Sequence, residues 1–153
     1  YAGLRSWDFD VQTQGYRYHM SNIFAGIGRV QLKRLDSEFA PKRKSLAKRY
    51  YENLHDVAGV KLIKGIDFNN TISFIYPVMI QNGKRDAIKH ILNEVGVPTG
   101  VHYKPNHLLS LFKTSYELPV SMQVYEEIMT LPMHPELSFD EVDMICNLIK
   151  ANL

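Results

Sequence analysis

The chain contains one cysteine, Cys146, among its 153 residues, so it cannot form an internal disulfide framework. A lone thiol fits a reducing compartment, and we expect the protein to be cytoplasmic. No apolar run approaches the roughly 20 residues that a membrane-spanning helix needs, and no signal-peptide pattern opens the sequence. The formal net charge of +2 is too small to indicate a nucleic acid or an anionic membrane as a partner.

Several catalytic and metal-binding motifs are absent as well. The sequence has no glycine-rich phosphate loop, no nucleophile elbow and no Ser/His/Asp triad. His102, His107 and His134 are spaced unlike any compact set of metal ligands, so no metal site is expected. The basic residues between Lys33 and Arg49 are diluted by acidic ones, which favours a solvated helix surface over a nucleic-acid site.

Local sequence signals predict most of the helices and strands. Apolar residues recur at helical spacing after Ser21, which can cap a helix, and Pro41 is expected to kink or divide the long helix that follows. Ser138 and Glu141 form a capping box, which is the clearest helix start in the chain. Periodicity predicts further helices over 87–95 and 121–129, short helical turns over 107–112, and strands over 60–63, 73–80, 97–103 and 130–133.

This order of elements predicts an α+β fold. We expect a small, mostly antiparallel sheet with helices on one face, preceded by an extended arm and a long kinked helix. The arm is predicted because Trp7, Phe9 and Val11 alternate with polar residues, as they would in an arm or in one short strand. Residues 1–20 are therefore assigned to an arm and loop, and residues 21–153 to a small domain.

Residues 14–23 are the most chemically distinctive stretch, because two aromatics, an arginine and a histidine lie between a glycine and a helix start. The start of a helix collects unpaired backbone N–H groups and attracts anions. Arg17 adds a planar charged fork that suits a phosphate or a carboxylate. The stretch is therefore a candidate anion site. Alternatively, Tyr16, Tyr18 and Met20 belong to a core and Arg17 is solvated.

Three motifs connect this stretch to a known family. They are Gly15-Tyr16-Arg17-Tyr18-His19-Met20-Ser21-Asn22-Ile23 with the helix through Gln31-Leu32-Lys33-Arg34-Leu35-Asp36, then Gly100-Val101-His102-Tyr103-Lys104-Pro105, then Leu131-Pro132-Met133-His134-Pro135. In this order they resemble the C-terminal part of the DegT-type sugar aminotransferases. These are pyridoxal-phosphate-dependent enzymes of the aspartate-aminotransferase superfamily (fold type I). The resemblance covers nearly the whole chain and implies that it forms the small C-terminal domain of such an enzyme.

The resemblance implies transfer of an amino group from an amino acid, glutamate, to a keto carbon of a nucleotide-linked sugar, in amino-sugar or polysaccharide biosynthesis. The cofactor would be pyridoxal 5′-phosphate, held as a Schiff base on a lysine. In the family this lysine lies upstream of the Gly-Tyr motif, in a Ser-x-His-x-x-Lys-like context that the chain lacks. We therefore expect no catalytic residue here and no activity from this chain alone. The first residue is Tyr1, and the larger part of the enzyme is expected upstream.

The resemblance also implies four site residues and a homodimer with shared active sites. Arg17 stands where the family has an asparagine that reaches the cofactor phosphate in the partner subunit, and it would bind that phosphate. His19 replaces an arginine on the substrate side, where a packed core histidine is the alternative. His102 and Tyr103 match a loop that lines the sugar side of the pocket. Alternation in a strand would place them on opposite faces, and we favour His102 as the residue that faces the pocket.

A second interpretation belongs to a different class of protein. Without the cofactor lysine, the chain could be a non-catalytic α+β module that binds an anionic small molecule or a protein partner. A Ser-x-His-x-x-Lys-like segment immediately upstream would favour the enzyme, whereas a start codon close to Tyr1 would favour the module.

Overall fold

The computed structural model describes residues 16, 18–112 and 114–153 of the chain. It divides into two compact units, residues 1–33 and 34–153, which are described separately below. The expected arm, including Trp7, Phe9 and Val11, lies outside the described residues. Within the described part, no helix is both long and apolar enough to cross a membrane.

Helix α1 (Asn22–Arg34) supplies most of what is described of the first unit. Its first turn is capped as the sequence predicts, because the Phe24 backbone N–H donates to the Ser21 hydroxyl over 3.3 Å. None of its residues is buried within this chain. The apolar residues that repeat at helical spacing, among them Ile23, Ile27 and Val30, are all more than half exposed.

The second unit begins with a change of helical geometry. Residues Leu35–Phe39 form a π-helical turn, and helix α2 (Ala40–Leu54) follows with Pro41 in its first turn. A proline fits there because the first N–H groups of a helix have no partner inside it. The predicted break therefore does not fall at Pro41 itself: the change of helical geometry precedes it, over Leu35–Phe39. Helix α2 ends at Leu54, and Gly59 lies in the turn that leads to the sheet, at a φ of 87°.

The sheet has three antiparallel strands in the order β1-β2-β3. They are β1 (Val60–Leu62), β2 (Tyr76–Ile80) and β3 (Ile128–Leu131). The predicted strand over 97–103 is wrong, because only Gly100 in that segment pairs with the sheet, through Thr130. Pro98 lacks a backbone N–H, so the segment cannot form a continuous ladder.

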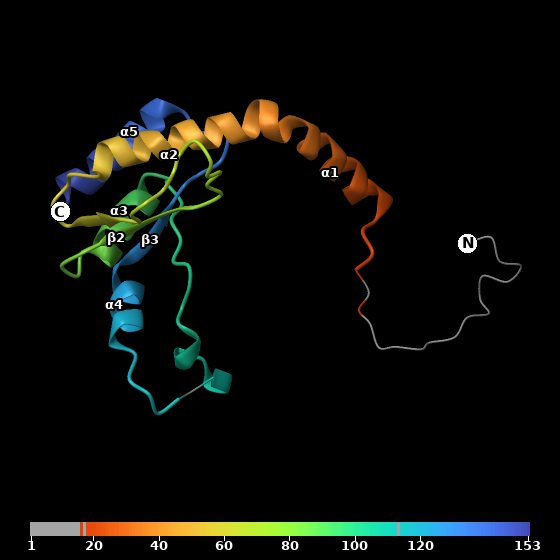
Figure 1. Cartoon of the computed structure of the whole chain (residues 1–153). Coiled ribbons are helices and arrows are strands. Elements are labelled where there is room, and N and C mark those ends of the chain that lie inside the picture. Colours follow the sequence, from red (N-terminus) through yellow and green to blue (C-terminus); the bar gives the residue numbers. More distant parts are fainter. Residues whose placement is uncertain (1–15, 17, 113) are drawn as a thin grey trace, which may run out of the picture. The chain divides into compact units, whose positions relative to one another are not determined.

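Helices α2, α3 (Arg85–Glu94) and α5 (Phe139–Ala151) form the helical layer, with α5 in contact with both α2 and α3 (Figure 1). Strand β2 alternates buried and half-buried residues, as a strand does when one of its faces packs on a core. The fully buried side chains come from both layers and include Leu46, Tyr50, Leu54, Val78, Ile80, Ile88, Leu92, Met129, Ile145 and Ile149. The predicted α+β fold with a small antiparallel sheet is confirmed.

Local signals set the boundaries of α3 and α5. Asn82 and Gly83 both take positive φ angles, of 60° and 70°, in the turn that leads into α3. Helix α5 starts with the predicted capping box, in which the Ser138 hydroxyl accepts from the Glu141 backbone N–H over 3.2 Å. In return, the Glu141 carboxylate accepts from the Ser138 backbone N–H over 2.8 Å.

Two tyrosines occupy the centre of the core. The rings of Tyr50 and Tyr76 are stacked, with centroids 4.9 Å apart and an angle of 22° between their planes. Both hydroxyl groups are buried, and neither has a hydrogen-bond partner among the described residues. Burial raises the pKa of both phenols, and it raises the pKa of the nearby Cys146 thiol to about 12.

Candidate functional site

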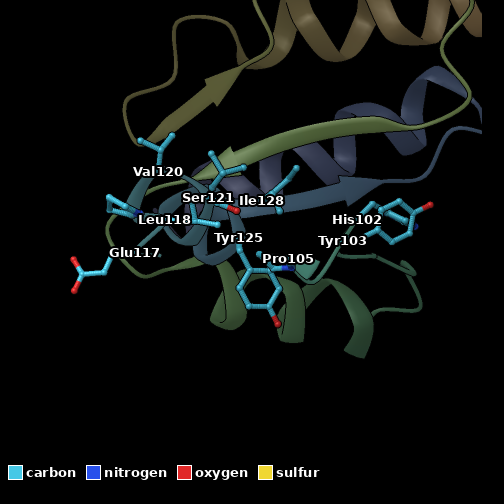
Figure 2. Close-up of a pocket in the computed structure, with 11 residues that line it drawn as sticks. His102, Tyr103, Pro105, Glu117, Leu118, Val120, Ser121, Tyr125 and Ile128 are labelled. Atoms are coloured by element: carbon cyan, nitrogen blue, oxygen red, sulfur yellow. The ribbon is translucent and has the colours of Figure 1, made fainter. Parts of the chain in front are cut away.

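A cavity of about 590 Å³ lies between the loop after Gly100 and the segment that leads into helix α4 (Pro119–Glu127). His102 and Tyr103 lie on one side of it, and Leu118 and Ser121 lie on the other (Figure 2). The remaining lining residues are Pro105, Glu117, Pro119, Val120, Val124, Tyr125 and Ile128. The pocket therefore combines an apolar wall from the start of α4 with imidazole, phenol, hydroxyl and carboxylate groups that can hydrogen-bond a ligand.

His102 is anchored from behind by the last strand of the sheet. Its Nδ1 lies 2.9 Å from the hydroxyl oxygen of Thr130, which belongs to β3. Thr130 is only 6% exposed, and its backbone exchanges two hydrogen bonds with Gly100. The ring of His102 thus has a fixed partner inside the protein on one side and faces the pocket on the other.

Tyr103 packs against His102 edge to face, with the ring centroids 4.8 Å apart and the planes at 88°. Its side chain is 77% exposed, so its hydroxyl is available to a ligand at the rim of the pocket. Both residues line the pocket, which differs from the alternation expected of a strand. The difference follows from the backbone, because residues 101–105 are not part of a strand.

A buried arginine supports the opposite wall of the pocket. Arg85, the first residue of α3, is 8% exposed and donates from Nη1 to the carbonyl oxygen of Ile128 over 3.0 Å. Its guanidinium also lies over the ring of Tyr125, 5.8 Å from the centroid. Sequence reasoning missed Arg85 and the wall from α4, because nothing in the local sequence shows that residues 85, 125 and 128 meet.

The two other predicted site residues lie in the first unit. Arg17 falls outside the described residues. His19 is exposed, and so are its neighbours Tyr16 and Tyr18, whose ring centroids are 5.9 Å apart. These tyrosines therefore have no place in a core built from the described residues, and a role for Arg17 or His19 at the pocket remains a prediction. Among the described residues, no group of three or more His, Cys, Asp or Glu side chains is placed to hold a metal ion.

The sequence of the chain identifies its family. The model of the DegT/DnrJ/EryC1/StrS aminotransferase family matches residues 2–150. The chain therefore belongs to the DegT/DnrJ/EryC1/StrS aminotransferase family, and the resemblance carried by the three motifs is confirmed. Enzymes of this family depend on pyridoxal phosphate, the cofactor that the resemblance implied.

Curated relatives include sugar aminotransferases. The chain is 30% identical over 144 residues to dTDP-4-dehydro-2,3,6-trideoxy-D-glucose 4-aminotransferase of Saccharopolyspora spinosa, a match that covers 94% of this chain and 37% of the relative. It is 25% identical over 160 residues to the spore coat polysaccharide biosynthesis protein SpsC of Bacillus subtilis, covering 98% of this chain and 41% of SpsC. The chain thus spans about two fifths of the length of these relatives.

Solved structures agree with this assignment. The aminotransferase TlmJ from Streptoalloteichus hindustanus shares 33% identity with a TM-score of 0.82, over 95% of this chain and 40% of TlmJ. Spr1654 from Streptococcus pneumoniae, in its PMP-form, shares 28% identity with a TM-score of 0.83, over 97% of this chain and 39% of Spr1654. A PLP-form of Spr1654 is similar to the chain as well.

The lining of the pocket does not fit the cofactor itself. Holding pyridoxal phosphate takes a lysine for its aldehyde carbon and positively charged or N–H donors for its phosphate. The side chains described around the pocket include neither a lysine nor an arginine. Imidazole, phenol, hydroxyl and carboxylate groups beside an apolar wall instead suit a neutral, hydroxyl-bearing ligand.

Proposed function

We propose that the chain is the C-terminal part of a pyridoxal-phosphate-dependent aminotransferase that moves an amino group from glutamate to the keto carbon of a nucleotide-linked sugar. The observation that carries the proposal is a pocket with hydrogen-bonding groups but no cofactor-binding cation, in a chain of this aminotransferase family. The names of the relatives support a nucleotide-sugar substrate. The lone buried thiol of Cys146 supports a cytoplasmic location.

In this proposal the pocket binds the sugar and not the cofactor. His102 and Tyr103 hydrogen-bond oxygen atoms of the hexose, while Leu118 and Val120 cover one of its apolar faces. The cofactor, bound elsewhere, supplies the electron sink for amino transfer. The contribution of this chain is to orient the keto carbon and to exclude water from one side of it.

The segment before α1 would complete a second part of the site. Arg17 binds the cofactor phosphate of the partner subunit through a charge-assisted hydrogen bond, and His19 contacts the substrate. Residues 1–20 are then an arm and loop that serve a neighbouring active site, and the enzyme is a homodimer with shared sites. The exposure of Tyr16, Tyr18 and Met20 supports this, because a core segment would bury them.

The sugar-binding role is tested with Tyr103→Phe in the full-length protein that contains this chain. Loss of one neutral hydrogen bond predicts a threefold to tenfold rise in KM for the nucleotide-linked keto-sugar, at roughly unchanged KM for glutamate. Tyr116→Phe is the matched control, since Tyr116 is 79% exposed and does not line the pocket. Equal KM values in the two variants would remove Tyr103 from the substrate site.

The enzyme class is tested by following the conversion of glutamate to 2-oxoglutarate with a panel of keto-sugar nucleotides. If no member of the panel supports turnover while the protein binds anions, the non-catalytic module is the better description. Arg17→Ala is expected to lose the cofactor during dialysis, read from its visible absorbance, whereas the exposed Arg29→Ala is expected to retain it. Equal retention would argue against the proposed contact of Arg17 with the phosphate.

Shared sites make a separate prediction. A mixture of Arg17→Ala subunits with subunits that lack the cofactor lysine should recover part of the activity, because one hybrid site then contains both residues. If the mixture stays as inactive as the two variants alone, Arg17 and the cofactor lysine would belong to an active site formed by one subunit.

A further inference from the structure

In the hydrogen bond between His102 and Thr130, the burial of Thr130 determines which group donates the proton. A threonine hydroxyl has one proton to donate and can also accept, and a neutral imidazole has one donor and one acceptor nitrogen. Thr130 is buried, and its hydroxyl makes one hydrogen bond among the described residues, the one to Nδ1 of His102. If Nδ1 carried the proton, the hydroxyl proton would be left buried without an acceptor, at a cost in free energy.

Gly100 makes this arrangement sterically possible. A Cβ atom at position 100 would lie 2.6 Å from Cε1 and 3.2 Å from Nδ1 of His102. The imidazole therefore occupies the space that any other residue at position 100 would fill. The same glycine exchanges backbone hydrogen bonds of 3.1 and 2.8 Å with Thr130, so the strand, the glycine and the ring are held as one unit.

The geometry points to Thr130 as the positioning residue that selects the tautomer of His102. Its hydroxyl donates to Nδ1, so Nδ1 is the acceptor and the ring proton is on Nε2, the nitrogen that remains for the pocket. His102 then presents an N–H donor to a ligand oxygen, such as a sugar hydroxyl or a neutral carbonyl. This inference rests on the proposed function only for the identity of the ligand, because the tautomer is a property of the folded protein.

The tautomer is measured by NMR on the protein labelled with 15N in its histidine rings. The His102 signals are identified by their loss in His102→Gln. Wild-type protein and Thr130→Ser are expected to show a protonated Nε2 and an unprotonated Nδ1, because both retain a hydroxyl. Thr130→Val removes the hydroxyl while keeping the shape of the side chain, and it is expected to give a mixture of tautomers or the Nδ1–H form. Thr99→Val is the control, since the Thr99 hydroxyl donates to Asn93.

Two outcomes would overturn the inference: a proton on Nδ1 in the wild-type protein, or a Thr130→Val tautomer identical to that of wild type. Gly100→Ala provides a second route to the same answer, because it displaces the ring while the Thr130 hydroxyl is retained. It is expected to weaken the preference for Nε2–H, and an unchanged preference in a folded Gly100→Ala protein would also count against the coupling.

Kinetics separate this inference from the proposed function. In the full-length enzyme, Thr130→Val is expected to raise KM for the nucleotide-linked sugar by roughly threefold to tenfold at similar kcat, with recovery in Thr130→Ser. If the tautomer changes as expected but KM does not, Thr130 still positions His102, and it is the proposed contact between His102 and the sugar that fails.

Discussion

Replacing Tyr50 by phenylalanine should make the protein more stable. The Tyr50 side chain is completely buried, and its hydroxyl has no hydrogen-bond partner among the described residues. A buried hydroxyl without a partner costs about 1–3 kcal/mol relative to water. Phenylalanine removes that cost and keeps the ring stacked on Tyr76. Because the lost oxygen leaves a small void that offsets part of the gain, we expect a net increase of about 1 kcal/mol in the free energy of unfolding.

The assay is urea unfolding followed by circular dichroism, with the midpoint and slope fitted separately. In a thermal scan the same gain corresponds to a rise in Tm of about 2–4 °C for a chain of this size. Tyr116→Phe is the control, because its exposed hydroxyl should change stability by no more than about 0.5 kcal/mol. A loss of about 1 kcal/mol in Tyr50→Phe would show that a buried water satisfies the hydroxyl, and would refute the reasoning.

Three further predictions concern α5. Ser138→Ala should lower the free energy of unfolding by about 1 kcal/mol in urea titrations, because the capping box is lost. Hydrogen bonds from the Ser138 backbone N–H and hydroxyl hold the pKa of Glu141 below its usual value. The Glu141 carboxylate therefore stabilises the fold at neutral pH, and this contribution is lost as the pH falls through its folded-state pKa. Glu141→Gln should therefore show a weaker loss of stability in acid than wild type. Burial raises the pKa of Cys146 to about 12, so Ellman's reagent at pH 8 should react with it in urea and hardly at all without urea.

The parts of the fold that the sequence predicts well are those with local causes. The capping box at Ser138 and the cap at Ser21 each involve atoms only three residues apart, so the motif contains the whole interaction. The turn at Asn82 and Gly83 is predictable for the same reason, because it depends on two residues that tolerate positive φ. The sheet is predicted less well, since strand pairing joins residues far apart in the sequence.

The error over 97–103 shows this limit. The apolar residues there gave a β-like pattern, but a strand needs a partner along its whole length, and only Gly100 has one. The resulting loop geometry places both His102 and Tyr103 at the pocket. In a strand, alternation would put their side chains on opposite faces, so only one of them would reach the pocket. The α4 wall and Arg85 could not be predicted at all, because tertiary packing brings them together.

Most of the candidate site is predictable from the sequence only through its resemblance to the family. The helix start and the guanidinium chemistry indicate Arg17 as a possible anion ligand but leave its solvated alternative open. Arg17 lies outside the described residues. For His102 and Tyr103 the structure adds what the motif lacks, namely the pocket that both residues line and the Thr130 hydroxyl that holds His102.

The backbone pair between Gly100 and Thr130 ties the pocket to the edge of the sheet. Local opening of this pair would release the histidine ring at the same moment, because the Thr130 hydroxyl is the partner of Nδ1 of His102. On warming, affinity for the ligand should therefore fall in step with the local opening of this pair and before the protein unfolds globally. Amide hydrogen exchange at Thr130 measures that local opening. The pairing of Gly100 with Thr130 thus couples the local stability of the sheet edge to the binding of a ligand.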